Sequence, residues 1–250
     1  MSRISAVVIT YNEERNIERC LKSLQNISDE IIVIDSFSTD RTEEICKSFN
    51  VNFYKRQWDD FSSAKNAGNE KAVHYWILSL DADEALSDEL KKSILEIKNT
   101  NAAGNYKFNR LTNYCGKWIH HCGWYPDTKT RLFLRTQCHW EGTVHEQLVI
   151  KSNAPVHFLK GDLLHYSYVT TDEFISKQNK YAETSAAQLY RRGTKANFFH
   201  VYMKPPIKFF RDYIFHLGLL DGKEGYTISR ISAKALYRKY KRLSELQRSH

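Results

Sequence analysis

Three short apolar runs in the first third of the chain, residues 4–9, 30–35 and 75–80, alternate with amphipathic segments. Residues 51–56, which are more polar, are expected to form a further, shorter strand. Near-continuous apolar runs of this length are typical of strands buried on both faces of a sheet. Between the first two runs, Ile17, Leu21 and Leu24 follow helical spacing at i, i+4 and i+7. Strands that alternate with helices predict an α/β fold, with a mostly parallel sheet between two layers of helices.

Polar residues mark where three of the helices are expected to begin. Thr10-Tyr-Asn-Glu13 has the spacing of a capping box, and Asp40 precedes Glu43 by the same three residues. A third helix is expected over residues 62–73. Ser87 is expected to cap a fourth helix, whose apolar face carries Leu90, Ile94 and Ile97.

The pattern changes to strand-like runs from Tyr106 and to helical spacing beyond Thr171. The strand-like runs, rich in aromatic residues and histidine, cover residues 106–111, 130–135, 148–150 and 155–159. We therefore predict a Rossmann-like α/β domain over residues 1–170, with halves 1–105 and 106–170. A basic, aromatic helical extension is expected over residues 171–250.

Two carboxylates, Asp81 and Asp83, directly follow the buried run Trp76–Leu80. In open α/β sheets ligands bind at the carboxyl ends of the strands, which is where these two side chains are expected. Paired carboxylate oxygens suit Mg²⁺ or Mn²⁺ held jointly with a phosphate-bearing substrate. A solvated surface turn is the alternative interpretation of Asp-x-Asp. The position after a buried strand favours a metal–diphosphate site.

Several motifs and signals are missing from the sequence. The first strand-to-helix turn lacks G-x-G-x-x-G, which argues against nicotinamide and flavin cofactors. No Walker-type P-loop occurs either, so a diphosphate would have to be bound in another way. Five cysteines form no CxxC pair and are expected to be reduced thiols. Since no secretion signal is apparent either, we expect a cytoplasmic protein.

The positive charge is concentrated at the C-terminal end of the chain. Residues 185–250 carry fourteen Lys or Arg and four Asp or Glu, a formal charge of +10, which leaves −2 for residues 1–184. Residues 197–250 mix these cations with many Phe and Tyr, a composition that suits the anionic surface of a membrane. Nucleic-acid binding would also explain the charge, but no recognised module of that kind occurs. A solvated helical hairpin is the third possibility.

Several motifs together resemble the family 2 glycosyltransferases of GT-A fold. They are Val7-Val-Ile-Thr-Tyr-Asn-Glu-Glu14, Val33-Ile-Asp-Ser-Phe-Ser-Thr-Asp40, Ala64-Lys-Asn66 and Leu80-Asp-Ala-Asp-Glu84. With Trp140-Glu-Gly-Thr-Val-His-Glu146 and Leu164-His-Tyr-Ser-Tyr168, the chain is similar to the lipopolysaccharide-core β-1,4-glucosyltransferases. The likeness covers residues 4–170.

The resemblance implies a UDP-sugar donor and a divalent metal ion, and it assigns roles to individual residues. The nucleotide would be bordered by Thr10, Tyr11, Asn12 and Glu13. Asp35 would accept from the uracil N3–H, and Lys65, where many relatives have Arg, would approach the nucleotide or its phosphates. Asp81 and Ala82 would line the donor site, with Asp81 near the ribose or the metal's water shell. Asp83 would ligate the metal. Each role has a structural alternative. Thr10 and Glu13 would only cap a helix, Asp35 would only be a carboxylate at the end of a strand, and Lys65 would only be a solvated helix residue.

Inverting transfer also needs a carboxylate base for the acceptor hydroxyl and a cation at the leaving diphosphate. We expect the base to be Glu146, with Glu141 second and Asp127 third. His145 is a candidate for orienting the base or binding the metal, and His165 is a candidate metal ligand. The alternative for each is a structural residue that only packs. Three tryptophans, Trp118, Trp124 and Trp140, would suit a platform for sugar rings, with core packing as the alternative.

The expected function is therefore transfer of glucose from UDP-glucose to a heptose of the lipopolysaccharide inner core. The acceptor would be a lipid-linked oligosaccharide, met by a peripheral protein at the cytoplasmic face of the inner membrane. A nucleotidyltransferase is a rival, although it would usually show a Gly-rich basic loop after the first strand. A non-catalytic binding protein that docks on membranes is the rival from another class.

Overall fold

The protein's structure, a computed structural model, describes residues 2–100, 104–142, 146–151 and 154–248. Its sheet strands are β1 (Ile4–Thr10), β2 (Glu30–Asp35), β3 (Asn52–Lys55), β4 (Trp76–Asp81), β5 (Glu84–Leu86), β6 (Asn105–Tyr114), β7 (Lys117–Ile119), β8 (Asp127–Leu134) and β11 (Val156–Tyr168). These described strands form one sheet in the order β3-β2-β1-β4-β8-β6-β11-β5, with β7 beside β6. A separate hairpin joins β9 (Cys138–Glu141) to β10 (Gln147–Ile150).

The chain divides into two compact units. The first contains residues up to Arg110 together with Asp127–Tyr166, and the second contains Leu111–Pro126 together with the chain from Ser167 onward. The helical extension predicted from residue 171 lies in the second unit. That unit also takes in Leu111–Pro126, which the sequence had placed with the α/β domain.

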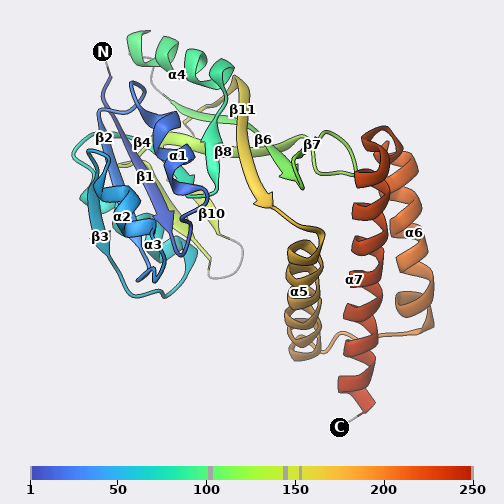
Figure 1. Cartoon of the computed structure of the whole chain (residues 1–250). Coiled ribbons are helices and arrows are strands. Elements are labelled where there is room, and N and C mark those ends of the chain that lie inside the picture. The colour runs from blue at the N-terminus through green and yellow to red at the C-terminus, as the bar shows by residue number, and fades with distance from the viewer. Residues whose placement is uncertain (1, 101–103, 143–145, 152–153, 249–250) are drawn as a thin grey trace. The chain divides into compact units, whose positions relative to one another are not determined.

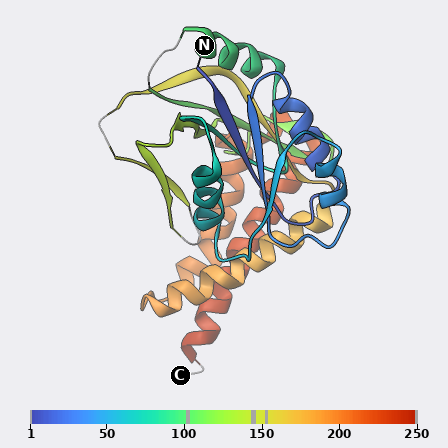
Figure 2. The same cartoon turned by 90° about the vertical axis from the view of Figure 1, so that its left-hand side faces the viewer.

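The first unit is the predicted α/β sandwich. Strands β3, β2, β1 and β4 are parallel neighbours, and all seven residues of β1 are buried. One apolar cluster joins this sheet to α1 (Ile17–Leu24) and α4 (Asp88–Thr100), whereas another joins it to α3 (Phe61–Lys71). Figure 2 shows α3, in teal, and α1, in blue, on opposite sides of the sheet. The α/β class and the helices on both faces are confirmed.

The register of the parallel strands brings three polar residues to one edge of the sheet. Thr10 at the end of β1 pairs with Asp35 at the end of β2, while Ile9 pairs with Asp81 at the end of β4. These residues therefore lie side by side at the carboxyl ends of adjacent strands, where α/β sheets bind ligands.

The helix starts agree only in part with the sequence patterns. The Ser87 hydroxyl accepts from the Leu90 N–H, as predicted for a cap. The predicted capping box at Thr10 is wrong, because α1 begins at Ile17 after Asn16. α2 (Thr42–Lys47) begins two residues beyond Asp40, whose carboxylate accepts from the Thr42 N–H.

The antiparallel part of the sheet was harder to predict. Strands β5, β7 and β9, each of three or four residues, were not predicted from the sequence, and β11, predicted only over residues 155–159, continues to Tyr168. Such short strands carry little periodicity of their own, and they are held by pairing with distant segments, as β5 is by β11.

The second unit is largely helical. It contains α5 (Thr171–Arg191), the π-helical turn η1 (Phe199–Met203), α6 (Lys204–Phe210), a second π-helical turn η2 (Arg211–Phe215), the 3-10 turn η3 (Gly218–Asp221) and α7 (Gly222–Arg248). Both α5 and α6 pack along α7 (Figure 1). An apolar cluster built from Tyr114, Cys122, Phe174, Ile228 and Ile231 forms its core.

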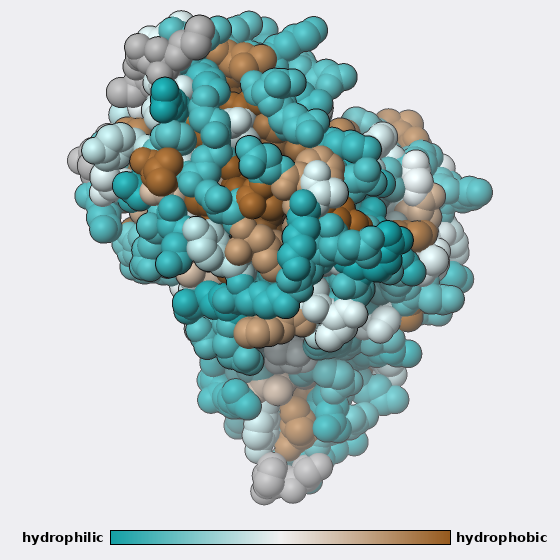
Figure 3. All heavy atoms as spheres, turned by 60° about the vertical axis from the view of Figure 1, so that its left-hand side comes forward, coloured by the Kyte–Doolittle hydropathy of each residue, from teal (hydrophilic) through white to brown (hydrophobic). Residues whose placement is uncertain are grey.

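No helix in the described part of the chain is long and apolar enough to cross a lipid bilayer. Hydrophilic side chains cover most of the face in Figure 3, with smaller hydrophobic areas between them.

Gly68 sets the distance between α3 and β1, and we expect Gly68→Ala to destabilise the protein. An added Cβ would lie 2.3 Å from Val7 Cγ1 and 3.2 Å from Ile34 Cγ1. Overpacking of this kind costs about 1–3 kcal/mol, more than the ~1 kcal/mol that alanine gains over glycine in a helix. Urea unfolding should therefore show a lower free energy of unfolding. Glu70→Ala on the exposed side of the same helix is the control, and an unchanged or raised stability of Gly68→Ala would contradict the expectation.

Candidate functional site

Two strand-to-helix loops are tied together at the edge of the sheet that carries Thr10 and Asp35. The Asn12 N–H donates to the Ser38 hydroxyl and the Asn12 side-chain oxygen accepts from the Thr39 N–H, both at 2.8 Å. The Glu13 N–H donates to the Thr42 hydroxyl at 2.8 Å. The polar residues that resembled a helix cap therefore brace a neighbouring loop instead.

The residues of the Thr10–Glu13 loop differ in solvent exposure. Thr10 is buried and its hydroxyl has no hydrogen-bond partner among the described residues, whereas Tyr11 is 57% exposed. Asn12 adopts a left-handed backbone conformation with φ of 53°. A buried hydroxyl without a partner is free to bind a ligand. Nucleotide contact by Thr10–Glu13 remains a prediction.

Asp35 is fully buried at the end of β2. Its carboxylate accepts hydrogen bonds from the Ser38 N–H and the Ser38 hydroxyl, and its backbone carbonyl accepts from the Arg56 N–H. The Asp35 side chain therefore also closes its own loop. Its contact with the uracil ring remains a prediction.

Asp81 lies between two cations. Its Oδ1 is 3.0 Å from Lys65 Nζ and its Oδ2 is 3.1 Å from Arg131 Nη2. Burial alone would raise the pKa of the Asp81 carboxyl, but the charges of Lys65 and Arg131 outweigh it and hold the pKa well below its ordinary value. Asp81 is thus a fixed anion at the end of β4, with both oxygens already engaged. Ala82 beside it is buried, and its N–H donates to the Ile9 carbonyl.

Lys65 joins Asp81 to the favoured base candidate. It projects from α3, is fully buried, and its Nζ lies 3.0 Å from Glu146 Oε1 as well as from Asp81. The same ammonium group sits 4.7 Å from the centre of the Trp140 ring. Next to it, the Asn66 amide donates to the Trp140 carbonyl and accepts from the Trp140 N–H, which fixes β9 against α3. The sequence placed Lys65 near the nucleotide but did not predict this bridge.

Three charged residues of the site were missed by the sequence analysis. Arg131 on β8 is 3% exposed and contacts both Asp81 and Glu84, which is itself buried. Arg110 on β6 pairs with Glu84 at 3.4 Å and with Asp127 at 2.7 Å. The sequence offered a signal for the two arginines, because each lies inside a strand-like run, where its side chain is expected to be buried. A buried charge requires a partner of opposite charge.

The turn after β4 brings Asp83 to a histidine. His165 Nε2 lies 3.2 Å from Asp83 Oδ2, and the Tyr166 N–H donates to the Asp83 carbonyl. Pairing of β11 with β5 produces this contact, because His165 sits opposite Glu84 in the register. Both side chains are only partly buried, with 21% of Asp83 and 15% of His165 exposed.

Asp83 and His165 fit a divalent metal ion that shares its coordination with a diphosphate. One carboxylate oxygen and one imidazole nitrogen are a donor pair that suits Mn²⁺, and phosphate and water oxygens would supply the remaining ligands. Within the described ranges no three Asp, Glu, His or Cys side chains converge into a fuller ligand set. Asp81, also predicted as a metal ligand, has its oxygens occupied by Lys65 and Arg131.

The other base candidates have different surroundings from Glu146. Glu141 is exposed at the end of β9 and pairs with His139 at 2.5 Å. Asp127 is paired with Arg110 and Lys129. Burial raises the pKa of the Asp127 carboxyl, but these two cations outweigh it and lower the pKa below its ordinary value. His145 lies outside the described residues.

The expected tryptophan platform is not supported by burial. Trp140 is only 6% exposed, so that its ring packs beneath Lys65 and Arg131 and presents no face to a sugar. Trp124 packs against Tyr114 and Phe174 in the core of the second unit. Trp118 is half-buried on β7.

Comparison with known proteins identifies the family. Residues 5–149 match the model described as glycosyl transferase family 2. The chain belongs to that family. As such it is a glycosyltransferase, and the resemblance found in the sequence motifs is confirmed.

Individual relatives extend the likeness to most of the chain. The chain is 28% identical to an uncharacterized glycosyltransferase of Rickettsia typhi, covering 98% of this chain and 88% of the relative. It is 26% identical to the lipopolysaccharide core biosynthesis glycosyltransferase LpsC of Rhizobium meliloti, covering 95% and 93%. Among solved structures, S. aureus TarS in complex with UDP-GlcNAc gives a TM-score of 0.47 at 16% identity, covering 99% and 92%.

Proposed function

We propose that this glycosyltransferase moves a hexosyl group from a UDP-sugar, UDP-glucose in the first instance, to a heptose of the lipopolysaccharide inner core. The observation that carries the proposal is the arrangement around Lys65. This one buried cation holds both Asp81, at the donor end of the sheet, and Glu146, a carboxylate suited to act as base. The name of the Rhizobium meliloti relative supports a lipopolysaccharide-core acceptor.

In the proposed reaction the acceptor hydroxyl attacks the anomeric carbon of the donor with inversion. The new C–O bond forms as the bond to the diphosphate breaks, UDP leaves, and the hydroxyl proton passes to Glu146. Lys65 occupies Glu146 Oε1, which leaves Oε2 for the proton. The Lys65 and Arg131 charges keep the Asp81 carboxyl ionised at neutral pH.

A divalent metal ion would be held by Asp83 and His165. When bound it would neutralise the charge that develops on the leaving diphosphate. The surrounding fold holds these two residues in place, because the Tyr166 N–H and the β5–β11 pairing fix the turn that carries Asp83.

The second unit is proposed to keep the enzyme at the cytoplasmic face of a membrane, where a lipid-linked acceptor is available. Support comes from the basic and aromatic character of residues 197–250 and from the large apolar side chains exposed there, such as Phe198, Phe210 and Phe215.

The test is UDP release from a panel of UDP-sugars, with heptose-containing truncated lipopolysaccharide as acceptor. We expect acceptor-stimulated release with UDP-glucose. Adding EDTA should lower the rate by at least about tenfold, and Mn²⁺ or Mg²⁺ should restore it. Faster release with another UDP-sugar would change the donor and keep the rest of the proposal. If UDP-sugars bind but no acceptor causes release of UDP, and if Asp83→Asn has no effect on that binding, the non-catalytic alternative would be favoured instead.

A further inference from the structure

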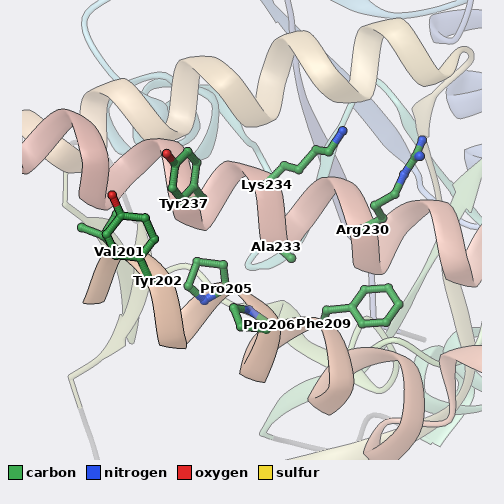
Figure 4. Close-up of a pocket in the computed structure, with 9 residues that line it drawn as sticks. All are labelled: Val201, Tyr202, Pro205, Pro206, Phe209, Arg230, Ala233, Lys234 and Tyr237. Atoms are coloured by element: carbon green, nitrogen blue, oxygen red, sulfur yellow. The ribbon is translucent and has the colours of Figure 1, made fainter. Parts of the chain in front are cut away.

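A groove of about 350 Å³ lies within the second unit, between α7 and the helical segment η1–α6. Its apolar lining comes from Val201, Pro205, Pro206, Phe209 and Ala233. Figure 4 shows the two prolines in the middle, with Phe209 toward one end and Tyr202 and Tyr237 toward the other. The surface of this groove suits a hydrocarbon chain, because prolines and aliphatic side chains offer contact area and few hydrogen-bonding groups.

Two cations on α7 stand at one side of the groove, and Figure 4 shows their charged ends directed away from the two prolines. Arg230 and Lys234 are exposed and stand four residues apart, on the same face of the helix. Neither has a carboxylate partner within the described residues, and the Arg230 guanidinium has only the Tyr226 ring at 5.9 Å. From Gly225 to Ser244 the helix carries six Lys or Arg and no Asp or Glu. An anionic group would therefore find unpaired cations on the α7 side of the groove, outside its apolar lining.

The helical segment before α7 exposes large apolar side chains next to this groove. Phe210 is 57% exposed and Phe215 is 78% exposed, and Phe199, Tyr202, Ile207 and Ile214 are exposed as well. Apolar side chains that gather on a surface mark interaction sites with proteins or membranes. Together with the basic face of α7 they make this part of the unit amphipathic.

We propose that the groove binds one anionic phospholipid of a membrane surface. The acyl chain would lie against Val201, Pro205 and Ala233, and the phosphate would be met by Arg230 and Lys234. This inference rests on the membrane-docking part of the proposed function and adds a defined lipid site to it. Nucleic acid is the less favoured occupant, because an aliphatic and proline-lined groove gives base edges nothing to hydrogen-bond.

The first experiment compares vesicle binding of charge variants that remove the same number of cations. The full chain is sedimented with phosphatidylcholine vesicles that contain or lack phosphatidylglycerol. We expect binding only to the anionic vesicles, and an approximately 30-fold loss in Arg230→Gln/Lys234→Gln, about fivefold for each charge. The control, Arg191→Gln/Arg192→Gln, removes two exposed cations, one at the last residue of α5 and one directly after it. Equal losses in both double variants would overturn the proposal, because unspecific attraction would then suffice.

A second variant tests the apolar part of the site without changing any charge. Ala233→Leu fills the groove, so we expect weaker binding to the anionic vesicles once circular dichroism and thermal unfolding show a native fold. Unchanged or stronger binding would overturn the lipid site, since added apolar surface favours simple adsorption. A single-stranded oligonucleotide that binds as tightly and is lost in Arg230→Gln/Lys234→Gln would overturn it as well.

The same measurements separate this inference from the proposed function. If the wild-type chain ignores anionic vesicles, both the groove and membrane docking fail, while UDP release in the presence of a detergent-dispersed acceptor still tests glycosyl transfer. If the vesicles bind but the groove variants behave as wild type, membrane docking stands and the groove assignment alone is overturned.

Discussion

Glu146→Gln is expected to lower the rate of glycosyl transfer about 10³-fold, within the range that a general base contributes. The amide keeps the size of the side chain and an oxygen for Lys65, 3.0 Å away in the wild type, but it cannot take up the acceptor proton. The loss should therefore appear in kcat at saturating donor and acceptor, measured as UDP release. The affinity for UDP should remain within about threefold of wild type, since the base does not act on the leaving group.

The matched control is Glu141→Gln in the same motif. Glu141 is exposed and pairs with His139, so its replacement should change kcat by less than about threefold. The reverse result, with a large loss in Glu141→Gln and a small one in Glu146→Gln, would contradict the assignment. Equal large losses would mean that the motif acts as a structural unit rather than through one carboxylate.

The sequence predicted the parallel half of the sheet well because each of its strands is buried on both faces. Continuous apolar residues in β1, β2 and β4 carry that information locally. Placing Asp35 and Asp81 at one edge needed only the parallel direction of the strands. The loop at Thr10–Glu13 was misread because its backbone N–H groups and the Asn12 side chain bind residues 38–42, contacts that no local spacing reveals.

The charge network was less predictable because it depends on contacts between distant segments. Lys65 and Glu146 are 81 residues apart, and Arg131 meets Asp81 across 50 residues. Their pairing follows from the packing of α3 on the sheet and from the position of β8 beside β4. A single sequence shows that buried charges need partners, but it does not show which partners they take.

Lys65→Met should cost both stability and activity, since it removes the cation shared by Asp81 and Glu146. Breaking a buried ion pair from one side costs about 3–5 kcal/mol, and we expect the lower end because a quarter of each carboxylate is exposed. Transfer should fall roughly 100-fold as Glu146 loses its orientation. Urea unfolding and UDP release measure the two effects, and Lys71→Met at the end of the same helix is the control.

The pH dependence of stability distinguishes this role from simple packing. The folded pKa of Asp81 lies below its unfolded value, since Lys65 and Arg131 outweigh burial, so its stabilising contribution is complete above about pH 4. That contribution is lost as the pH falls through the folded pKa. The stability difference between wild type and Lys65→Met should therefore be largest near neutral pH and shrink below about pH 4. A difference that is constant with pH would assign Lys65 to packing alone. In that case Lys65→Arg, which keeps the positive charge, should be no more active than Lys65→Met.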